Sequence, residues 1–345
     1  MIPSTAPILG LRMQSDRTGP PLEFTEGCDH VERVHVMISQ DTTYGCGDYL
    51  SRVSVPSSGK ESSACSAMEE DDGISVDPSL DSIDAVCRER MATWKLRVVD
   101  HFHVPRETVA VSFSYLDRFV DRCQCDRSAF KLAAMTTLYM AAKIFGSSHK
   151  ITIRSLADLS RGEFEMSHIS EMETIILQTL EWRLNPPTAQ CFINSFYNYL
   201  PVQQGPVSIA IYQRAIFFVE LALYDYSFVT KKRALVALAA LINAMEGLNE
   251  STFPQQQQES FVDIICTTFG LKFSHEEIES VRNRLWYVYS MSAQYKEDDA
   301  VSPDTVKRDP QRKHNDEDAM QVEPSSPSSS PVSVAGPVSS HHHRS

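Results

Sequence analysis

Long apolar runs are missing from this sequence of 345 residues. The longest, Ala234 to Ala244, has the length of a buried helix, whereas a helix that spans a bilayer needs about 20 apolar residues. The start, Met1-Ile-Pro-Ser, also lacks the basic segment and apolar run of a signal peptide. We therefore expect no membrane partner and a location in the nucleus and cytoplasm, with a weak nuclear-import candidate at Lys307-Arg308 and Arg312-Lys313.

Basic residues are in the minority. The chain has 32 Lys and Arg against 45 Asp and Glu, a formal net charge of -13. A protein that binds nucleic acid without regard to sequence needs clustered Lys and Arg to neutralise phosphates. The composition therefore argues against a nucleic-acid partner, although it leaves room for a local basic patch.

Cysteine patterns typical of disulfide frameworks or zinc sites are also missing. The eight cysteines are scattered and none forms a C-x-x-C pair, so we expect reduced thiols. Cys123-Gln-Cys125 and His101-Phe-His103 could each supply half of a metal site, but no second pair lies at zinc-finger spacing. Ordinary helix residues are the favoured interpretation, and no metal site is expected.

Catalytic and phosphate-binding motifs are absent. The sequence has no G-x-x-x-x-G-K, no G-x-G-x-x-G, no H-E-x-x-H and no kinase H-R-D or D-F-G string. We therefore expect a protein that is not an enzyme, with no catalytic residues and no cofactor. An enzyme built on a buried carboxylate or thiol stays open as the less favoured alternative.

The two ends of the chain show no sustained hydrophobic period. Residues 1–80 are rich in Ser, Thr, Pro, Asp and Glu, and the stretch between Lys60 and Arg88 holds eight acidic residues and no Lys, Arg or His. This predicts a disordered acidic tail over 1–80 and a disordered Ser/Pro-rich tail over 296–345. Three serines in the second tail precede proline and are expected phosphorylation sites for proline-directed kinases: Ser302, Ser326 and Ser330.

Between the tails, glycine is scarce and helical periods follow one another, which predicts an all-α fold. Five helices are expected at about 81–101, 107–119, 126–145, 152–159 and 166–182. After Asn185-Pro-Pro187, where proline cannot continue a helix, five more are expected at about 188–199, 207–224, 230–246, 254–269 and 274–295. The third helix of each set is apolar on nearly all sides and should be buried. Ser274 with Glu277 predicts a capping box for the last helix. The order predicts two tandem five-helix repeats, 81–187 and 188–295.

Two charged residues stand out because each lies in an otherwise apolar helix: Lys143, in Tyr139-Met-Ala-Ala-Lys143-Ile-Phe, and Glu173, thirty positions later. With three further fragments in order, residues 88–200 resemble the amino-terminal cyclin box, and 201–295 resemble the more variable carboxy-terminal box. The further fragments are Arg88 ahead of Ala92-Thr-Trp94, Tyr115-Leu-Asp-Arg-Phe119, and Thr179-Leu-Glu-Trp182-Arg-Leu-Asn-Pro. The strings around Trp94 and Trp182 are most similar to D-type cyclins.

The resemblance implies a regulatory subunit that binds and activates a cyclin-dependent Ser/Thr protein kinase in cell-cycle progression of the G1/S type. In that family an invariant lysine and glutamate reach backbone groups of the kinase, and these roles fall on Lys143 and Glu173. A charged side chain on an apolar surface costs desolvation unless it is paired, so the two residues form an internal ion pair, anchor a partner, or do both. The resemblance also implies an apolar pocket for a kinase helix, formed by Met140, Ile144, Leu177 and Leu184.

Two further features of the family are altered here. Arg88 corresponds to an arginine that often pairs with an aspartate five residues later, but Thr93 occupies that position, so we expect a structural Arg88 with another acceptor. The family's docking patch for Arg-x-Leu segments of substrates or inhibitors is matched only at Met91 and Trp94. The remaining positions carry Cys87, Arg90, Arg97 and Lys131, whose cations predict weak or altered docking of such segments.

A binding protein of another class is the alternative interpretation. Similar helical double repeats occur in general transcription factors, in pocket proteins and in cyclins of transcriptional kinases, so a transcription-associated scaffold would have the same fold. A promoter-binding version should carry a zinc ribbon and a basic face, and neither pattern is present in the sequence.

Overall fold

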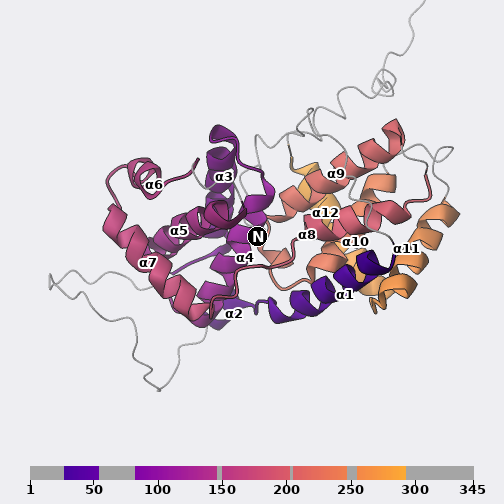
Figure 1. Ribbon diagram of the computed structural model, residues 1–345, viewed down its shortest axis with the longest axis horizontal. Helices are drawn as coiled ribbons and strands as arrows, with labels where there is room; N and C mark the ends of the chain where they lie inside the picture. Colours follow the sequence, from indigo (N-terminus) through magenta and orange to yellow (C-terminus); the bar gives the residue numbers. More distant parts are fainter. Residues whose placement is uncertain (1–26, 54–81, 146–149, 203–204, 247–254, 293–345) are drawn as a thin grey trace, which may run out of the picture. The chain divides into compact units, whose positions relative to one another are not determined.

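A computed structural model describes residues 27–53, 82–145, 150–202, 205–246 and 255–292. Every regular element within these ranges is a helix, as Figure 1 shows. The prediction of an all-α fold is therefore confirmed for the part of the chain that the structure describes. The three predicted phosphorylation sites, Ser302, Ser326 and Ser330, lie outside these ranges, as does the expected Ser/Pro-rich tail.

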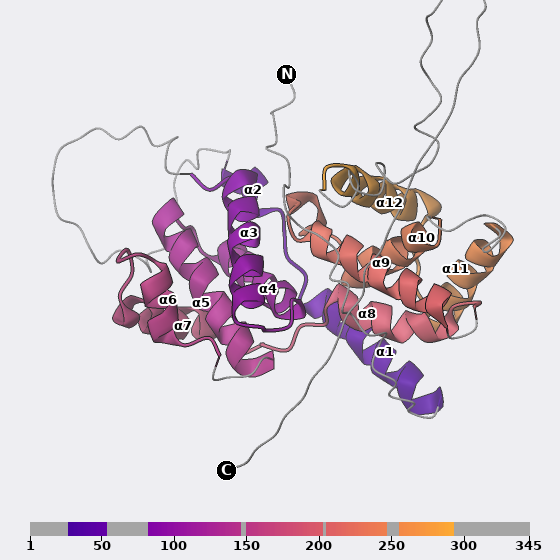
Figure 2. The same ribbon diagram turned by 90° about the horizontal axis from the view of Figure 1, so that it is seen from above.

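The first set of helices surrounds its third member. The set consists of α3 (Ala85–His101), α4 (Glu107–Arg122), α5 (Arg127–Phe145), α6 (Ile153–Leu159) and α7 (Met166–Thr179). Helix α5 packs against each of the other four, and in Figure 2 it lies between α3 and the α6–α7 pair. Its run from Ala133 to Leu138 is buried throughout, because a helix that is apolar on all sides is stable only when it is covered.

The second set repeats this arrangement. It consists of α8 (Ala189–Phe196), α9 (Pro206–Ala222), α10 (Arg233–Glu246), α11 (Gln255–Phe269) and α12 (His275–Ser290), with short 3-10 turns at Tyr197–Tyr199 and Tyr226–Phe228. Helix α10 packs against α8, α9, α11 and α12, and every residue from Ala234 to Met245 is buried. The predicted pair of five-helix repeats, each with a buried third helix, is confirmed.

Local capping explains where several helices begin. Thr152 and Thr188 accept backbone N–H groups with their side chains at the starts of α6 and α8. Ser274 accepts the amide of Glu277 at 3.1 Å, and the Glu277 carboxylate accepts the amide of Ser274 at 2.9 Å. Hydrogen bonding from Ser274 to the Glu277 carboxylate, from its backbone amide above all, lowers the pKa of Glu277 from its ordinary value. The capping box expected from the sequence is therefore present.

The expected disorder over residues 1–80 is wrong for residues 27–53, which form α1 (Gly27–Thr43) and α2 (Tyr49–Val53). Helix α1 packs against α8, α10 and α11 of the second set, beside which it lies in both views (Figures 1 and 2). Val34 is fully buried there, with Val31 and Ile38 packed on the same core. These three apolar residues at helical spacing are a short signal within a polar stretch, which is why composition hides the helix.

Candidate functional site

Lys143 and Glu173 lie side by side on neighbouring helices. Lys143 is in the last turn of α5, and Glu173 is near the middle of α7, which packs against it. The lysine Nζ lies 2.5 Å from Oε1 of the carboxylate and 4.8 Å from the centre of the Tyr139 ring. The Lys143 side chain is 43% exposed, whereas that of Glu173 is 15% exposed. Lys143 and Glu173 therefore pair with each other within the chain, and solvent reaches the pair mainly at the lysine.

Apolar side chains flank this ion pair. Ile144 and Phe145 follow Lys143 at the end of α5, and both are exposed, Ile144 at 46%. Leu177 lies one helical turn after Glu173 and is half-buried against the core. A salt bridge at the edge of exposed aliphatic and aromatic groups is the kind of surface that a partner helix can cover. We call this set the α5–α7 surface: Tyr139, Lys143, Ile144, Phe145, Glu173 and Leu177.

Two residues expected in the apolar pocket, Met140 and Leu184, are buried or half-buried in this structure. Met140 is 1% exposed, within the buried part of α5, so it does not face solvent in this structure, and its contact with a partner stays a prediction. Leu184 follows the end of α7 and is half-buried, and its backbone carbonyl accepts a hydrogen bond from the Tyr115 hydroxyl. Its contact with a partner stays a prediction.

Helix α7 ends at Thr179, three residues before the expected end at Trp182. Glu181 and Trp182 both adopt left-handed backbone conformations, with φ of 53° and 59°. The amide of Trp182 donates to the carbonyl of Leu177 at 3.1 Å, and that of Glu181 donates to Gln178 at 3.1 Å. This pattern is a Schellman motif in which glutamate replaces the usual glycine. The turn leaves the Trp182 side chain 69% exposed.

Three side chains of α4 hold the segment that follows α7. Helices leave their last carbonyls without intrahelical partners, and these side chains donate to such carbonyls or to those just beyond. The pairs are Tyr115 with Leu184, Arg118 with Arg183 at 2.8 Å, and Arg122 with Thr179. Left-handed backbone at non-glycine residues persists only where the surroundings determine it, and it concentrates at binding sites. From sequence alone Trp182 could be either a core residue or a contact, and in the structure it is exposed.

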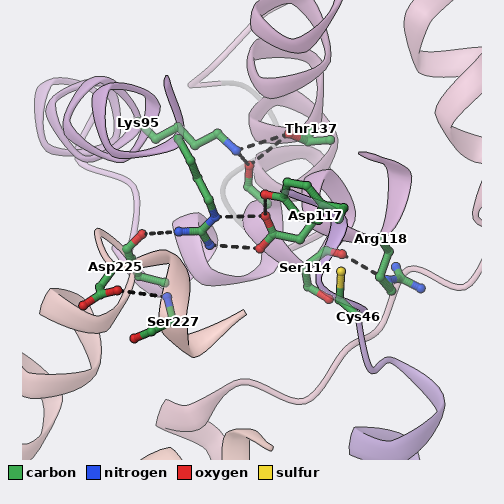
Figure 3. Close-up of polar contacts among 12 residues, drawn as sticks. Cys46, Lys95, Ser114, Asp117, Arg118, Thr137, Asp225 and Ser227 are labelled. Atoms are coloured by element: carbon green, nitrogen blue, oxygen red, sulfur yellow. Dashed lines mark hydrogen bonds and ion pairs between the residues drawn. The ribbon is translucent and has the colours of Figure 1, made fainter. Parts of the chain in front are cut away.

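Arg88 finds its acceptor on the neighbouring helix α4. Its Nε and Nη2 donate to the two carboxylate oxygens of Asp117 at 3.0 and 2.9 Å, and Nη1 donates to the carbonyl of Leu223 at 2.7 Å. The Tyr49 hydroxyl donates to the same carboxylate at 2.9 Å. Arg88, Asp117 and Tyr49 are all buried, and Asp117 lies at the centre of the network in Figure 3. The network joins α2, α3 and α4 to the end of α9, which agrees with a structural role for Arg88.

Lys95 is a second buried cation that the sequence analysis missed. Its side chain is 0% exposed, and Nζ donates to Ser112 Oγ at 2.7 Å and to Thr137 Oγ1 at 3.3 Å (Figure 3). The centre of the Phe113 ring lies 4.1 Å away. Burial lowers the pKa of Lys95 well below the usual lysine value. The sequence indicated this burial only by position, because Lys95 follows the buried Met91 by four residues and so lies on the same face of α3.

The residues of the expected docking patch lie along α3 and α5. Met91 is buried and Trp94 is half-buried, while Arg90 and Arg97 are exposed. Lys131 forms an ion pair with Glu163, and burial raises the pKa of the half-buried Cys87 thiol. Arg90 and Arg97 are therefore exposed on α3, and the weak or altered docking of Arg-x-Leu segments stays a prediction.

A metal site and a membrane-spanning helix can be looked for only in the residues that the structure describes. Within 27–53, 82–145, 150–202, 205–246 and 255–292, no three His, Cys, Asp or Glu side chains gather as they would around a metal ion. The thiol of Cys125 instead contacts the carbonyl of Cys123 at 3.6 Å. None of the described helices combines the length and the apolar character needed to cross a membrane.

Part of the chain matches a known protein family. Residues 58–185 match the family model described as Cyclin, N-terminal domain. The chain is 28% identical over 200 residues to the G1/S-specific cyclin-D1 of Xenopus laevis, which covers 56% of this chain and 68% of the relative. It is 26% identical over 162 residues to the G1/S-specific cyclin-D1 of Homo sapiens, covering 47% of this chain and 54% of the relative. The chain thus spans about half the length of the human relative.

A solved structure is similar as well. The viral cyclin from Herpesvirus saimiri aligns with 61% of this chain and 88% of its own length, at 18% identity and a TM-score of 0.49. The range matched by the family model contains Arg88, Asp117, Lys143 and Glu173. Residues 58–185 therefore match the cyclin family, and the chain is similar to G1/S-specific D-type members of it.

Proposed function

We propose that this protein is a regulatory subunit that binds a cyclin-dependent Ser/Thr protein kinase through the α5–α7 surface and activates it. The observation that carries the proposal is the Lys143–Glu173 pair, whose lysine is exposed and precedes the exposed Ile144 and Phe145. The protein acts by favouring the active conformer of its partner, and it performs no catalysis itself.

Binding to a partner explains the Lys143–Glu173 pair better than a contribution to folding stability does. An ion pair at the protein surface contributes about 0–1 kcal/mol to folding. Folding stability is therefore a weak reason for this pair to be present. The Lys143 ammonium has three N–H donors. Within the described residues it contacts one carboxylate and one ring face, which leaves donor capacity unused. A partner that covers Ile144 and Phe145 would bring backbone carbonyls to the donors that still face solvent.

The finer assignment follows from the relatives. Similarity to cyclins named G1/S-specific supports a role in cell-cycle progression of that type. We place the protein in the nucleus and cytoplasm, where such a kinase would act. Substrates and inhibitors of the kinase are further partners, with Arg-x-Leu segments bound weakly because Arg90 and Arg97 face them.

A charge swap tests the proposal. In Lys143→Glu with Glu173→Lys, the internal ion pair is kept but its polarity toward a partner is reversed. We expect the affinity for a cyclin-dependent kinase, measured by calorimetry across a panel of such kinases, to fall at least tenfold, or about 1.4 kcal/mol. Activity of the kinase toward a peptide substrate should fall in parallel at fixed concentrations.

The matched control is the same swap at Lys131 and Glu163, a second ion pair with a lysine on α5 and an exposed carboxylate partner. It should leave kinase affinity unchanged, and both variants should keep the wild-type unfolding midpoint. If the Lys143 and Glu173 swap bound the kinase as tightly as the wild type, the pair would be an internal salt bridge only. Failure of the wild type to bind any kinase in the panel would favour a transcription-associated scaffold.

A further inference from the structure

A cavity of about 100 Å³ lies where the two helix sets meet. Most of its walls come from α4 of the first set, from the end of α9 and the start of α10 in the second set, and from the segment that leads into α8. The residues of the α5–α7 surface do not line it. We call this space the junction cavity.

The walls of the junction cavity are largely apolar. Its buried apolar lining residues include Phe113, Val219, Ala222, Val229 and Val236. An apolar cavity of about 150 Å³ takes up one benzene molecule, so the junction cavity has room for a branched alkyl group or a small ring. Pockets that hold small molecules lie preferentially between domains, and they combine an apolar lining with a few polar groups that fix the orientation of the ligand.

The buried charges around the junction cavity are already matched. Glu107 is a lining carboxylate, and it accepts hydrogen bonds from the hydroxyl of Thr188 and from the thiol of Cys191. A ligand that brought its own charge among these groups would have to break a buried pair, which is strongly unfavourable. The part of a ligand that enters the cavity is therefore uncharged. The three lining arginines each have a carboxylate partner: Arg88 with Asp117, Arg106 with Glu220, and Arg233 with Asp41.

Lys231 differs from the other charged residues of the lining. It is the only exposed residue among those that line the junction cavity, which places it at the mouth. It forms no ion pair and no side-chain hydrogen bond with a residue that the structure describes. Its charge acts on Glu277, whose carboxylate is already held by the amide of Ser274. An ammonium at the mouth of an apolar cavity favours a ligand that ends in a carboxylate.

We propose that the junction cavity binds a small carboxylic acid that has a branched or cyclic apolar body. The body packs against the valines of α9 and α10, and the carboxylate pairs with Lys231 at the mouth. Both helix sets contribute to the walls, so the bound acid stabilises their arrangement and raises the unfolding midpoint. The affinity is modest, because a ligand of this size makes few contacts.

Three small molecules with similar branched bodies test the proposal on the full chain. Isovalerate carries an anionic end, isovaleramide a neutral end and isoamylamine a cationic end, and saturation-transfer NMR measures the affinity of each. Isovalerate should bind more tightly than isovaleramide by about fivefold, the effect of one exposed ion pair, and isoamylamine should bind most weakly. In spectra of valine methyl groups, isovalerate should shift the resonances of Val219, Val229 and Val236 and leave that of Val34 unchanged.

Variants separate the charge at the mouth from the space behind it. Lys231→Gln should weaken isovalerate binding about fivefold and leave isovaleramide within about twofold of the wild type. The matched control is Lys232→Gln, because Lys232 is the next residue, is also exposed and does not line the cavity. It should leave the affinity for isovalerate unchanged. Ala110→Leu fills space from α4 and should weaken both molecules about tenfold or more, because the body no longer fits.

Several results would overturn the proposal. They are the absence of saturable isovalerate binding to the wild type, an equal loss in Lys231→Gln and Lys232→Gln, tighter binding of isoamylamine than of isovalerate, and undiminished binding in a folded Ala110→Leu. If Ala110→Leu fails to fold, the comparison of the two lysine variants still decides. Kinase affinity should be unchanged in Lys231→Gln, so this proposal and the proposed function fail separately.

Discussion

The carboxylate of Asp117 accepts two parallel hydrogen bonds from Arg88, 3.0 Å from Nε and 2.9 Å from Nη2, with both residues buried. The third nitrogen of the same guanidinium donates across to Leu223 of the second helix set. One side chain thus satisfies a buried charge and fastens the two sets together. A planar fork with fixed donors suits this geometry, and an ammonium does not.

Arg88→Lys should therefore destabilise the protein although the charge is kept. We expect the free energy of unfolding to fall by about 3 kcal/mol, because a single ammonium cannot serve both carboxylate oxygens and the carbonyl of Leu223. Urea unfolding followed by circular dichroism measures the change. The control is Arg90→Lys, two residues along on the exposed side of α3, which should alter stability by less than about 0.5 kcal/mol. Equal stabilities would mean that the buried network contributes little.

Replacing Lys95 with methionine should stabilise the fold. Lys95 is fully buried without a carboxylate in ion-pair contact among the described residues, and an apolar side chain of similar volume removes the desolvation penalty. We expect a gain of about 1–4 kcal/mol near neutral pH by urea unfolding. A loss of stability would show that the hydrogen bonds to Ser112 and Thr137 outweigh the cost of burial.

The same variant should also change the pH dependence. Burial lowers the folded-state pKa of Lys95, so between that pKa and the ordinary value near 10.4 the unfolded chain binds more protons at this site than the folded one. The wild type should therefore gain stability as pH rises through this window, and Lys95→Met should not. The stability difference between the two should narrow from pH 7 to pH 9.5.

Glu181→Gly should stabilise the end of α7. Glu181 has a φ of 53° at the position where a Schellman motif usually has glycine, and a side chain in this region costs about 1–2 kcal/mol. We expect about 1 kcal/mol of added stability in thermal or urea unfolding. Gln178→Gly, an exposed position in the right-handed last turn of the same helix, should instead lose about 1 kcal/mol. If both glycines destabilise, the strain is not located at Glu181.

Trp182→Ala should weaken kinase binding without changing stability. The indole is 69% exposed, so its removal leaves no cavity, and exposed tryptophans held by a fixed backbone are typical binding hot spots. We expect a loss of about 2 kcal/mol in binding free energy, measured by calorimetry. Tyr287→Ala, which removes another exposed aromatic ring from α12, should leave affinity unchanged. An unchanged affinity for Trp182→Ala would place the indole outside the interface.

Some elements of this fold could be predicted from residues close together in the chain. The buried third helices and the Ser274–Glu277 capping box depend on contacts within one or two turns, and their patterns were visible. Helix α1 escaped prediction because its three inward residues, Val31, Val34 and Ile38, lie in a polar stretch. The left-handed end of α7 escaped because neither Glu181 nor Trp182 has a preference for that conformation.

The sequence predicted which residues form the candidate site better than it predicted how they are arranged. Lys143 and Glu173 could be selected because charge is unusual inside an apolar period, yet only the packing of α5 against α7 brings them to 2.5 Å. Packing of the helices also buries Met140, which the sequence pattern could not distinguish from Ile144, exposed one turn later. Asp117 was visible within Tyr115-Leu-Asp-Arg-Phe119, but its choice of Arg88 as a partner was not.

Sequence by itself determined that the chain forms two five-helix sets with apolar central members, because helix formation and amphipathic period depend on residues within a few positions of one another. Tertiary structure decided which charges meet, which are buried and which face solvent. Those outcomes depend on residues between 29 and 135 positions apart, as for Arg88 with Asp117 and with Leu223, and they arise only when helices pack.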